Sequence, residues 1–372
     1  MEKDIIIYKN KPKVSSRRIY GLDLLRIVSV INIIELHINK FGRLLNINPK
    51  DRRYKTIWNL EAIGYGAVNT FGLISGIVGY KRYKFSNLMI IWFQISFYSS
   101  LISIYLYYHK IITLKELFLS FLPILLKRLW YINAFFSMYL FLPFIITGIN
   151  NLNRKTHKNM LLLFFAFFIV YNRIGEKLIN KKNFHYLNNG QSTSWLMILF
   201  IFGAYFGKYI FVENKMHTFV YWALWILIYF LGTFFTSFIF FVFKIEEYYN
   251  YISISIVIQG ISLVFIFAEL KIKNKILIKI ISFSSQFSLN VIFIHLRLFL
   301  PNIPIKNWFF GITRELSPKF LVFKLYGISI IIYIICSIID YLRLILFRFL
   351  KIKELCISIE NKIPLFLEKI DF

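Results

Sequence analysis

The sequence predicts an all-α polytopic integral membrane protein with about ten transmembrane helices around a polar cavity. Hydrophobic residues make up 58% of the 372 residues, against about 45–50% in soluble domains. The mean hydropathy is +0.62. Apolar runs long enough to span a bilayer recur along the whole chain, and they set the number of helices that we expect.

The ten runs lie at residues 19–38, 60–80, 87–108, 129–149, 160–172, 194–212, 218–243, 252–270, 283–300 and 321–343. A further apolar piece at 117–126 is too short to span, and we expect it to be interfacial or re-entrant. The runs divide the chain into a cytoplasmic N-terminal segment (1–18), a ten-helix transmembrane domain (19–343) and a cytoplasmic amphipathic tail (344–372).

The charge of the chain is strongly basic, with a formal net charge of +27. The cations are spread over many short loops, so we interpret them as partners of lipid head groups and expect no nucleic-acid partner. Loops and adjoining helix ends on the N-terminal side carry 24 Lys and Arg residues and those on the opposite side carry 20, which favours cytoplasmic N- and C-termini. Cys336 and Cys356 have no metal-binding spacing, and we expect neither a metal site nor a disulfide.

The first apolar run contains ionisable residues that share one helical face. His37 follows Arg26 by eleven residues, which is about 1100° of helix, so the two side chains point the same way about 16 Å apart. Asp23 precedes Arg26 by three residues and is its local counter-ion. Glu35 points to nearly the opposite side. A charged residue in mid-membrane costs about 2.5–3.5 kcal/mol on insertion scales, so such a group has a partner or a function.

Two interpretations of this stripe remain open from the residues alone. Either Asp23, Arg26 and His37 form one polar site, or a buried Asp–Arg pair accompanies an unrelated histidine. Most other polar residues in the runs are typical of helix–helix contacts. We interpret Asp340 and Arg343 as snorkelling at a helix end.

Four segments resemble the membrane-embedded acyltransferase 3 family, which modifies surface sugars. The opening run from Arg18 through Arg26 to His37 is similar to the family's first helix, with its arginine and histidine separated by ten residues. The segment around Ser75 and Gly76 resembles its phenylalanine-rich Phe-x-x-Ser-Gly motif. The third segment is Leu129-Trp130-Tyr131 with Asn133, followed by Tyr139 to Pro143, and the fourth, a weaker match, is Asn290 to His295. Tyr131 and Glu35 depart from the commoner family residues, which leaves the substrate open.

This resemblance implies an O-acyltransferase that transfers an acyl group, most simply acetyl, from acyl-CoA to a hydroxyl of a cell-surface or lipid-linked polysaccharide. It implies a location in a bacterial cell membrane and no tightly bound cofactor, with acetyl-CoA as co-substrate. Membrane lipids, acyl-CoA and a glycan acceptor are the expected partners, and a homo-oligomer stays open.

The expected roles follow from the chemistry of each residue type. Histidine suits a general base or acyl relay because it titrates near neutrality, and arginine suits an anion because it stays charged. The expected catalytic residues are His37, Arg26 and Asp23; the substrate-binding residues are Glu35, Ser75, Trp130, Asn133 and His295; the CoA-binding residues are Lys81, Arg82 and Lys84. Ser75 has no local base, so we expect it to allow close helix packing rather than to act as a nucleophile.

A transporter or flippase for lipid-linked sugars is the alternative from another class, because it would use the same buried charges for a substrate pathway. The family-like segments and the lack of an internal repeat argue against it. A non-catalytic membrane scaffold leaves the Asp23, Arg26 and His37 stripe unexplained.

Overall fold

The computed structural model of the chain is a bundle of helices, and the residues it describes contain no strand. It describes residues 18–81, 83–122, 130–171, 187–212, 219–244, 248–298 and 317–367. The α-helices are α1 (Tyr20–Phe41), α2 (Tyr54–Gly64), α3 (Gly66–Gly79), α4 (Phe85–Tyr108), α5 (Leu114–Ser120), α6 (Trp130–Asn151), α7 (Arg154–Phe164), α9 (Thr193–Tyr205), α10 (Phe219–Phe243), α11 (Ile254–Ala268), α12 (Lys275–Ser285), α13 (Ser288–Leu298), α15 (Pro318–Phe349) and α16 (Ile352–Leu367). Short π-helical turns, η3 (Phe165–Tyr171) and η5 (Phe206–Ile210), extend α7 and α9.

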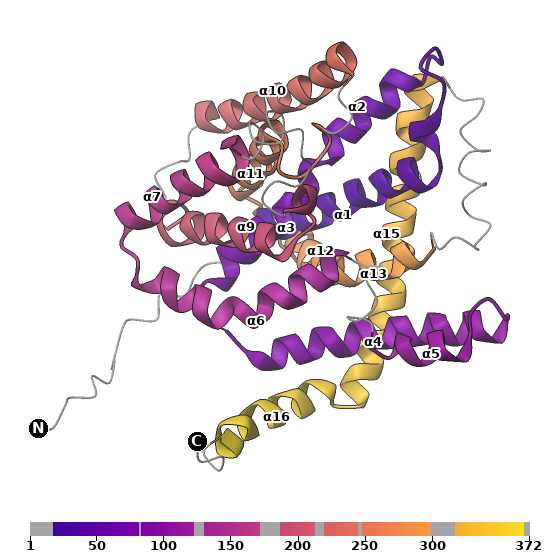
Figure 1. Cartoon of the computed structure of the whole chain (residues 1–372), viewed down its shortest axis with the longest axis vertical. Helices are drawn as coiled ribbons and strands as arrows, with labels where there is room; N and C mark the ends of the chain where they lie inside the picture. The colour runs from indigo at the N-terminus through magenta and orange to yellow at the C-terminus, as the bar shows by residue number, and fades with distance from the viewer. Residues whose placement is uncertain are drawn as a thin grey trace, which may run out of the picture.

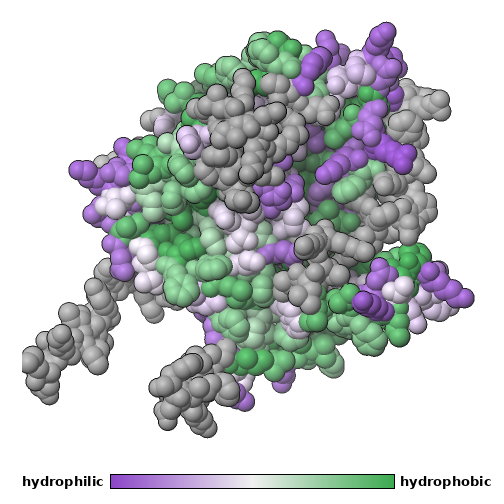
Figure 2. All heavy atoms as spheres, in the orientation of Figure 1, coloured by the Kyte–Doolittle hydropathy of each residue, from purple (hydrophilic) through white to green (hydrophobic). Residues whose placement is uncertain are grey.

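The outer helices carry the apolar surface of a membrane protein. Figure 2 shows hydrophobic side chains over much of the face in view. Phe230 and Phe234 on α10 and Ile338 on α15 are 62%, 60% and 57% exposed. Exposure of so much apolar surface to water would be unfavourable, whereas its contact with lipid tails is not. The all-α membrane fold expected from composition is confirmed.

The count of ten spanning helices is not confirmed. In the described part of the chain, six helices are long and apolar enough to cross a membrane, or seven if the bent pair α12 and α13 forms one span. Within the described residues, each of the ten predicted runs contains helix, but α7 and α11 are short, with 11 and 15 residues. The 22-residue α1 carries several ionisable residues, so its composition alone does not mark it as a lipid-facing span.

The helix α1 lies at the centre of the bundle (Figure 1). It packs against α2, α3, α11, α12, α13 and α15. Buried polar contacts join it to several of them. The Ser29 and Thr70 hydroxyls are 2.8 Å apart between α1 and α3, and Tyr326 of α15 donates to Asn32 at 3.1 Å. The polar side chains of Ser29 and Asn32 are therefore inside protein rather than in lipid.

The close approach of α3 and α9 depends on glycines. A Cβ on Gly76 would overlap the Phe200 carbonyl, and a Cβ on Gly203 would overlap the Leu73 carbonyl. Small residues let two helix backbones touch, and van der Waals packing replaces the hydrophobic effect that lipid cannot supply. This is the packing role that the sequence predicted for the Ser75–Gly76 segment.

The C-terminal tail helix begins later than the predicted boundary and packs on the bundle. The helix α15 continues to Phe349, and after a short break α16 packs along α4 (Figure 1). Glu360 of α16 accepts a hydrogen bond from the Phe85 backbone N–H at 2.6 Å, which caps the start of α4. The tail is thus joined to the bundle.

The snorkelling interpretation of Asp340 and Arg343 is wrong. Their exposed fractions are 0% and 5%, and Arg343 donates two hydrogen bonds to Asp340 at 2.9 and 3.0 Å. Tyr98 of α4 and Asn290 of α13 also donate to this carboxylate, at 2.6 and 3.0 Å. Because α15 extends beyond the predicted run, the pair lies inside the bundle, where it joins three helices.

The loop between α1 and α2 is held by one ion pair. Arg53 contacts Asp51 at 2.6 Å and donates further hydrogen bonds to it. These bonds lower the pKa of the Asp51 carboxyl to about 2. The carboxylate therefore stays ionised at any physiological pH.

Candidate active site

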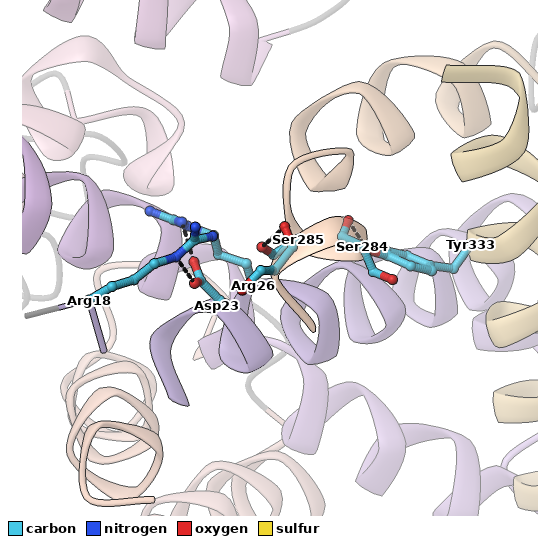
Figure 3. Close-up of polar contacts among 7 residues, drawn as sticks. Arg18, Asp23, Arg26, Ser284, Ser285 and Tyr333 are labelled. Atoms are coloured by element: carbon cyan, nitrogen blue, oxygen red, sulfur yellow. Dashed lines mark hydrogen bonds and ion pairs between the residues drawn. The ribbon is translucent and has the colours of Figure 1, made fainter. Parts of the chain in front are cut away.

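The first group of candidate residues lies at the start of α1. Asp23 is 4% exposed and accepts hydrogen bonds from Arg26 at 2.9 Å and from Arg18 at 2.6 Å. Figure 3 shows the side chains of both arginines reaching this carboxylate. The i, i+3 spacing of Asp23 and Arg26 on one helical face makes this contact local. Two cations share one anion here, so the group keeps a net positive charge that suits a negatively charged ligand.

The second group joins two histidines from distant parts of the chain. His37 Nδ1 lies 2.8 Å from Nε2 of His295, which is on α13 and is 0% exposed. The Nδ1 of His295 lies 2.7 Å from the Val291 carbonyl oxygen. A carbonyl oxygen only accepts, so Nδ1 of His295 carries a hydrogen.

These contacts fix the proton positions of the pair when both rings are neutral. With its hydrogen on Nδ1, His295 must accept at Nε2, so Nδ1 of His37 donates to it. The hydrogen of neutral His37 is then on Nδ1, and its Nε2 has an open lone pair. No described residue forms a hydrogen bond with that Nε2. The arrangement resembles a general base oriented by a second group.

The two groups are separated along α1. Eleven residues between Arg26 and His37 correspond to about 16 Å of helix. Arg26 therefore contacts Asp23 and does not contact the histidine pair. The stripe expected from the sequence contains two sites, one at each end.

Glu35 belongs to neither group. It points to the other side of α1, where Asn39 donates to Glu35 at 2.5 Å and to Glu61 of α2 at 3.1 Å. Sequence reasoning did not select Glu61, although a carboxylate at the start of the second apolar run was a signal of the same kind as Glu35. It also missed the burial of Asp340 and Arg343, whose i, i+3 spacing repeats that of Asp23 and Arg26.

The other expected substrate-binding residues are distant in sequence from the two histidines and lie on other helices. The Ser75 hydroxyl donates to the Phe71 carbonyl at 2.7 Å within α3. Trp130 is half-buried at the start of α6 and stacks on Tyr251, with ring centroids 5.6 Å apart. Asn133 lies one turn along the same helix and is also half-buried. Among these residues, the structure brings only His295 into contact with His37.

The expected CoA-binding cations follow the end of α3. Lys81 is exposed, and its ammonium lies 5.6 Å from the Tyr80 ring centroid. Lys84 is exposed directly before α4, and Arg82 lies outside the described residues. Lys208 of η5 lies near this end too, where it donates to the Ile149 and Leu152 carbonyls at the end of α6.

Comparison with known proteins gives a match that extends over most of the bundle. No curated protein and no solved structure matches the chain. A family model described as an acyltransferase domain matches residues 19–342, which include both ends of the α1 stripe, His295 and Asp340. The chain therefore belongs to acyltransferase family 3, a family of membrane acyltransferases.

Proposed function

We propose that this protein is an O-acyltransferase that transfers an acyl group, most simply acetyl from acetyl-CoA, to a hydroxyl of a cell-surface or lipid-linked polysaccharide in a bacterial cell membrane. Family membership supports acyl transfer. The single observation that carries the mechanism is the chain of contacts from His37 through His295 to the Val291 carbonyl. It supports an open Nε2 on His37, which is what a general base requires.

In the proposed reaction, His37 Nε2 accepts the proton of the acceptor hydroxyl as its oxygen attacks the thioester carbonyl carbon. The new C–O bond forms, the C–S bond breaks, and the departing thiolate takes the proton, which yields an ester and free CoA thiol. The imidazolium formed during attack donates from Nδ1 to His295, which disperses its charge. A histidine that carries the acyl group between two half-reactions would use the same open nitrogen.

The start of α1 is the proposed donor end. Arg26, held by Asp23, offers a fixed fork of N–H donors to a CoA phosphate. The extended pantetheine arm of CoA would then run along α1, because the thioester must reach His37, about 16 Å away. The exposed cations Lys81 and Lys84, and Arg82 by its sequence position, are further candidates for the phosphates at the mouth.

The proposed acceptor contacts come from α6. The half-buried ring of Trp130, supported by the stacked ring of Tyr251, offers an apolar face to a sugar ring. Asn133 offers an amide for sugar hydroxyls. Ser75 serves helix packing in this proposal, because its hydroxyl is bonded within α3.

The decisive experiment measures transfer of labelled acetyl from acetyl-CoA to glycan in membrane vesicles, for wild type, His37→Ala and Arg26→Ala. We expect His37→Ala to lose about 10²–10⁴-fold in rate, which is the usual contribution of a general base. We expect Arg26→Ala to raise the KM for acetyl-CoA. Equal labelling by all three proteins would refute the assignment. Movement of lipid-linked sugar without any labelling would favour the transporter instead.

A further inference from the structure

The strongest feature outside the proposed catalytic site is a pair of buried carboxyls between α1 and α2. Glu35 and Asn39 on α1 are each 0% exposed, and Glu61 on α2 is 5% exposed. The side-chain amide of Asn39 lies between the carboxyls and donates to both, at 2.5 and 3.1 Å. Both of its N–H groups are thereby engaged, so the amide brings the two acids to one point.

Two acceptor atoms at this point have no hydrogen-bond partner. They are Oε2 of Glu35 and Oδ1 of Asn39, both fully buried. A Cβ on Gly64 would lie 3.5 Å from that Glu35 oxygen, so the atom faces the α2 backbone one turn beyond Glu61. A buried acceptor without a donor costs about 1–3 kcal/mol. The cluster therefore has too many acceptors and too few donors.

The surrounding side chains do not supply the missing positive charge. The charged and titratable groups that face the two carboxyls are Lys40 on α1, Tyr326 on α15, and Tyr65, Tyr249 and Tyr251 beyond α2. Lys40 is exposed, and among the ion pairs of the described residues none joins it to either acid. Phenols are neutral at physiological pH. Two ionised carboxylates this close would repel one another in a dry interior.

We infer that Glu35, Asn39 and Glu61 form a proton-binding site, in which the two carboxyls hold at least one proton between them in the folded protein. The bound proton turns one carboxyl oxygen into a donor, which reduces both the repulsion and the shortage of donors. This site is separate from the proposed base, because the His37 side chain projects from the opposite face of α1. It makes the packing of α1 on α2 depend on protonation, and α1 carries His37.

The site lies within reach of one membrane surface. Glu61 follows the first residue of α2, Tyr54, by seven positions, which is about 10 Å of helix. The loop before α2 is the nearest aqueous region along the chain. The proton is therefore exchanged with that side of the membrane.

Infrared spectroscopy of the purified full-length protein in nanodiscs tests the inference directly. At neutral pH we expect a protonated-carboxyl C=O band that the Glu35→Gln/Glu61→Gln variant lacks. Asp51→Asn is the matched control, because the pKa of Asp51 is about 2 and its loss leaves the band unchanged. Absence of such a band from the wild type overturns the inference, whether or not the double variant folds.

Thermal unfolding against pH provides a second, activity-independent measurement. The unfolded glutamates release their protons near pH ~4.3 while the folded pair keeps one, so stability falls as pH rises above that value. One retained proton changes the folding equilibrium about tenfold per pH unit. We expect this slope in wild type and Asp51→Asn, and a reduced slope in the double glutamine variant. If the wild type lacks this slope and is more stable in sodium than in choline, the site binds a metal cation. That result would contradict the inference of a bound proton.

Discussion

At the scale of single residues, the contact between His37 and His295 carries most of the functional argument. Both histidines could be selected from the sequence, because each interrupts an apolar run. Their pairing could not, because 258 positions separate them and only the packing of α13 against α1 joins them. The proton positions of the pair also depend on the hydrogen bond between His295 and the Val291 carbonyl. That bond is set by the orientation of the His295 side chain, which the sequence does not show.

The acceptor role of His295 predicts different effects for two substitutions. His295→Ala removes the acceptor for His37 Nδ1–H, and an unsatisfied buried donor costs about 1–3 kcal/mol, or roughly five- to 150-fold in kcat. The side-chain oxygen of His295→Gln can accept the same hydrogen bond, so we expect most of the rate to return. The measurement is kcat for acyl transfer in reconstituted vesicles. If alanine and glutamine lower kcat equally, His295 does not orient the base in this way.

The buried pair of Asp340 and Arg343 predicts a non-additive effect on stability. Asp340→Asn leaves the Arg343 guanidinium buried without its counter-charge, which costs about 3–5 kcal/mol. Asp340→Asn combined with Arg343→Met removes both charges and should cost less than the single change. Thermal unfolding in detergent measures both. A double variant less stable than Asp340→Asn would contradict this account of the pair.

At the scale of helices, hydropathy located the segments but did not predict their environment. For the first run, hydropathy does not distinguish a face that contacts lipid from one that contacts other helices. In the described part of the chain, six helices pack on α1, so Ser29, Asn32 and Asn39 each contact a different neighbour. Hydropathy also could not show that the run at 60–80 begins earlier, because α2 starts at Tyr54 with polar residues in its first turns. Tertiary packing decides both points.

The contact between α3 and α9 predicts opposite effects for two glycine substitutions. Gly76→Ala places a methyl group into the Phe200 carbonyl, and overpacking of this kind costs about 1–3 kcal/mol. Gly148→Ala on α6 is the matched control, because nothing lies within 4 Å of its Cβ. There the higher helix propensity of alanine should leave stability equal or raise it by up to about 1 kcal/mol. Equal melting temperatures for the two variants would argue against tight packing of α3 on α9.

At the scale of the whole molecule, the start of α1 lies at one end of the bundle together with its cations, Arg18 and Arg26. Gly21 abuts the Phe267 carbonyl at the end of α11, and Phe265 contacts Phe211 after η5, with centroids 5.4 Å apart. Lys208 of η5 in turn caps the end of α6. The proposed donor end and the start of α7 therefore share one side, while the loop before α2 lies at the other.

This arrangement predicts which side of the membrane each end faces. Acyl-CoA is made in the cytoplasm, so the proposal requires Arg26 and the start of α7 to be cytoplasmic and the loop before α2 to be external. Lys50 and Lys155 are exposed at the two ends, and Cys336 and Cys356 are buried, so the native thiols should label weakly. In intact cells, a membrane-impermeant maleimide should label Lys50→Cys, whereas Lys155→Cys should react only after permeabilisation. The reverse pattern would place the donor end outside the cell, where no acyl-CoA is available, and the proposed direction of transfer would be wrong even if His37 is the base.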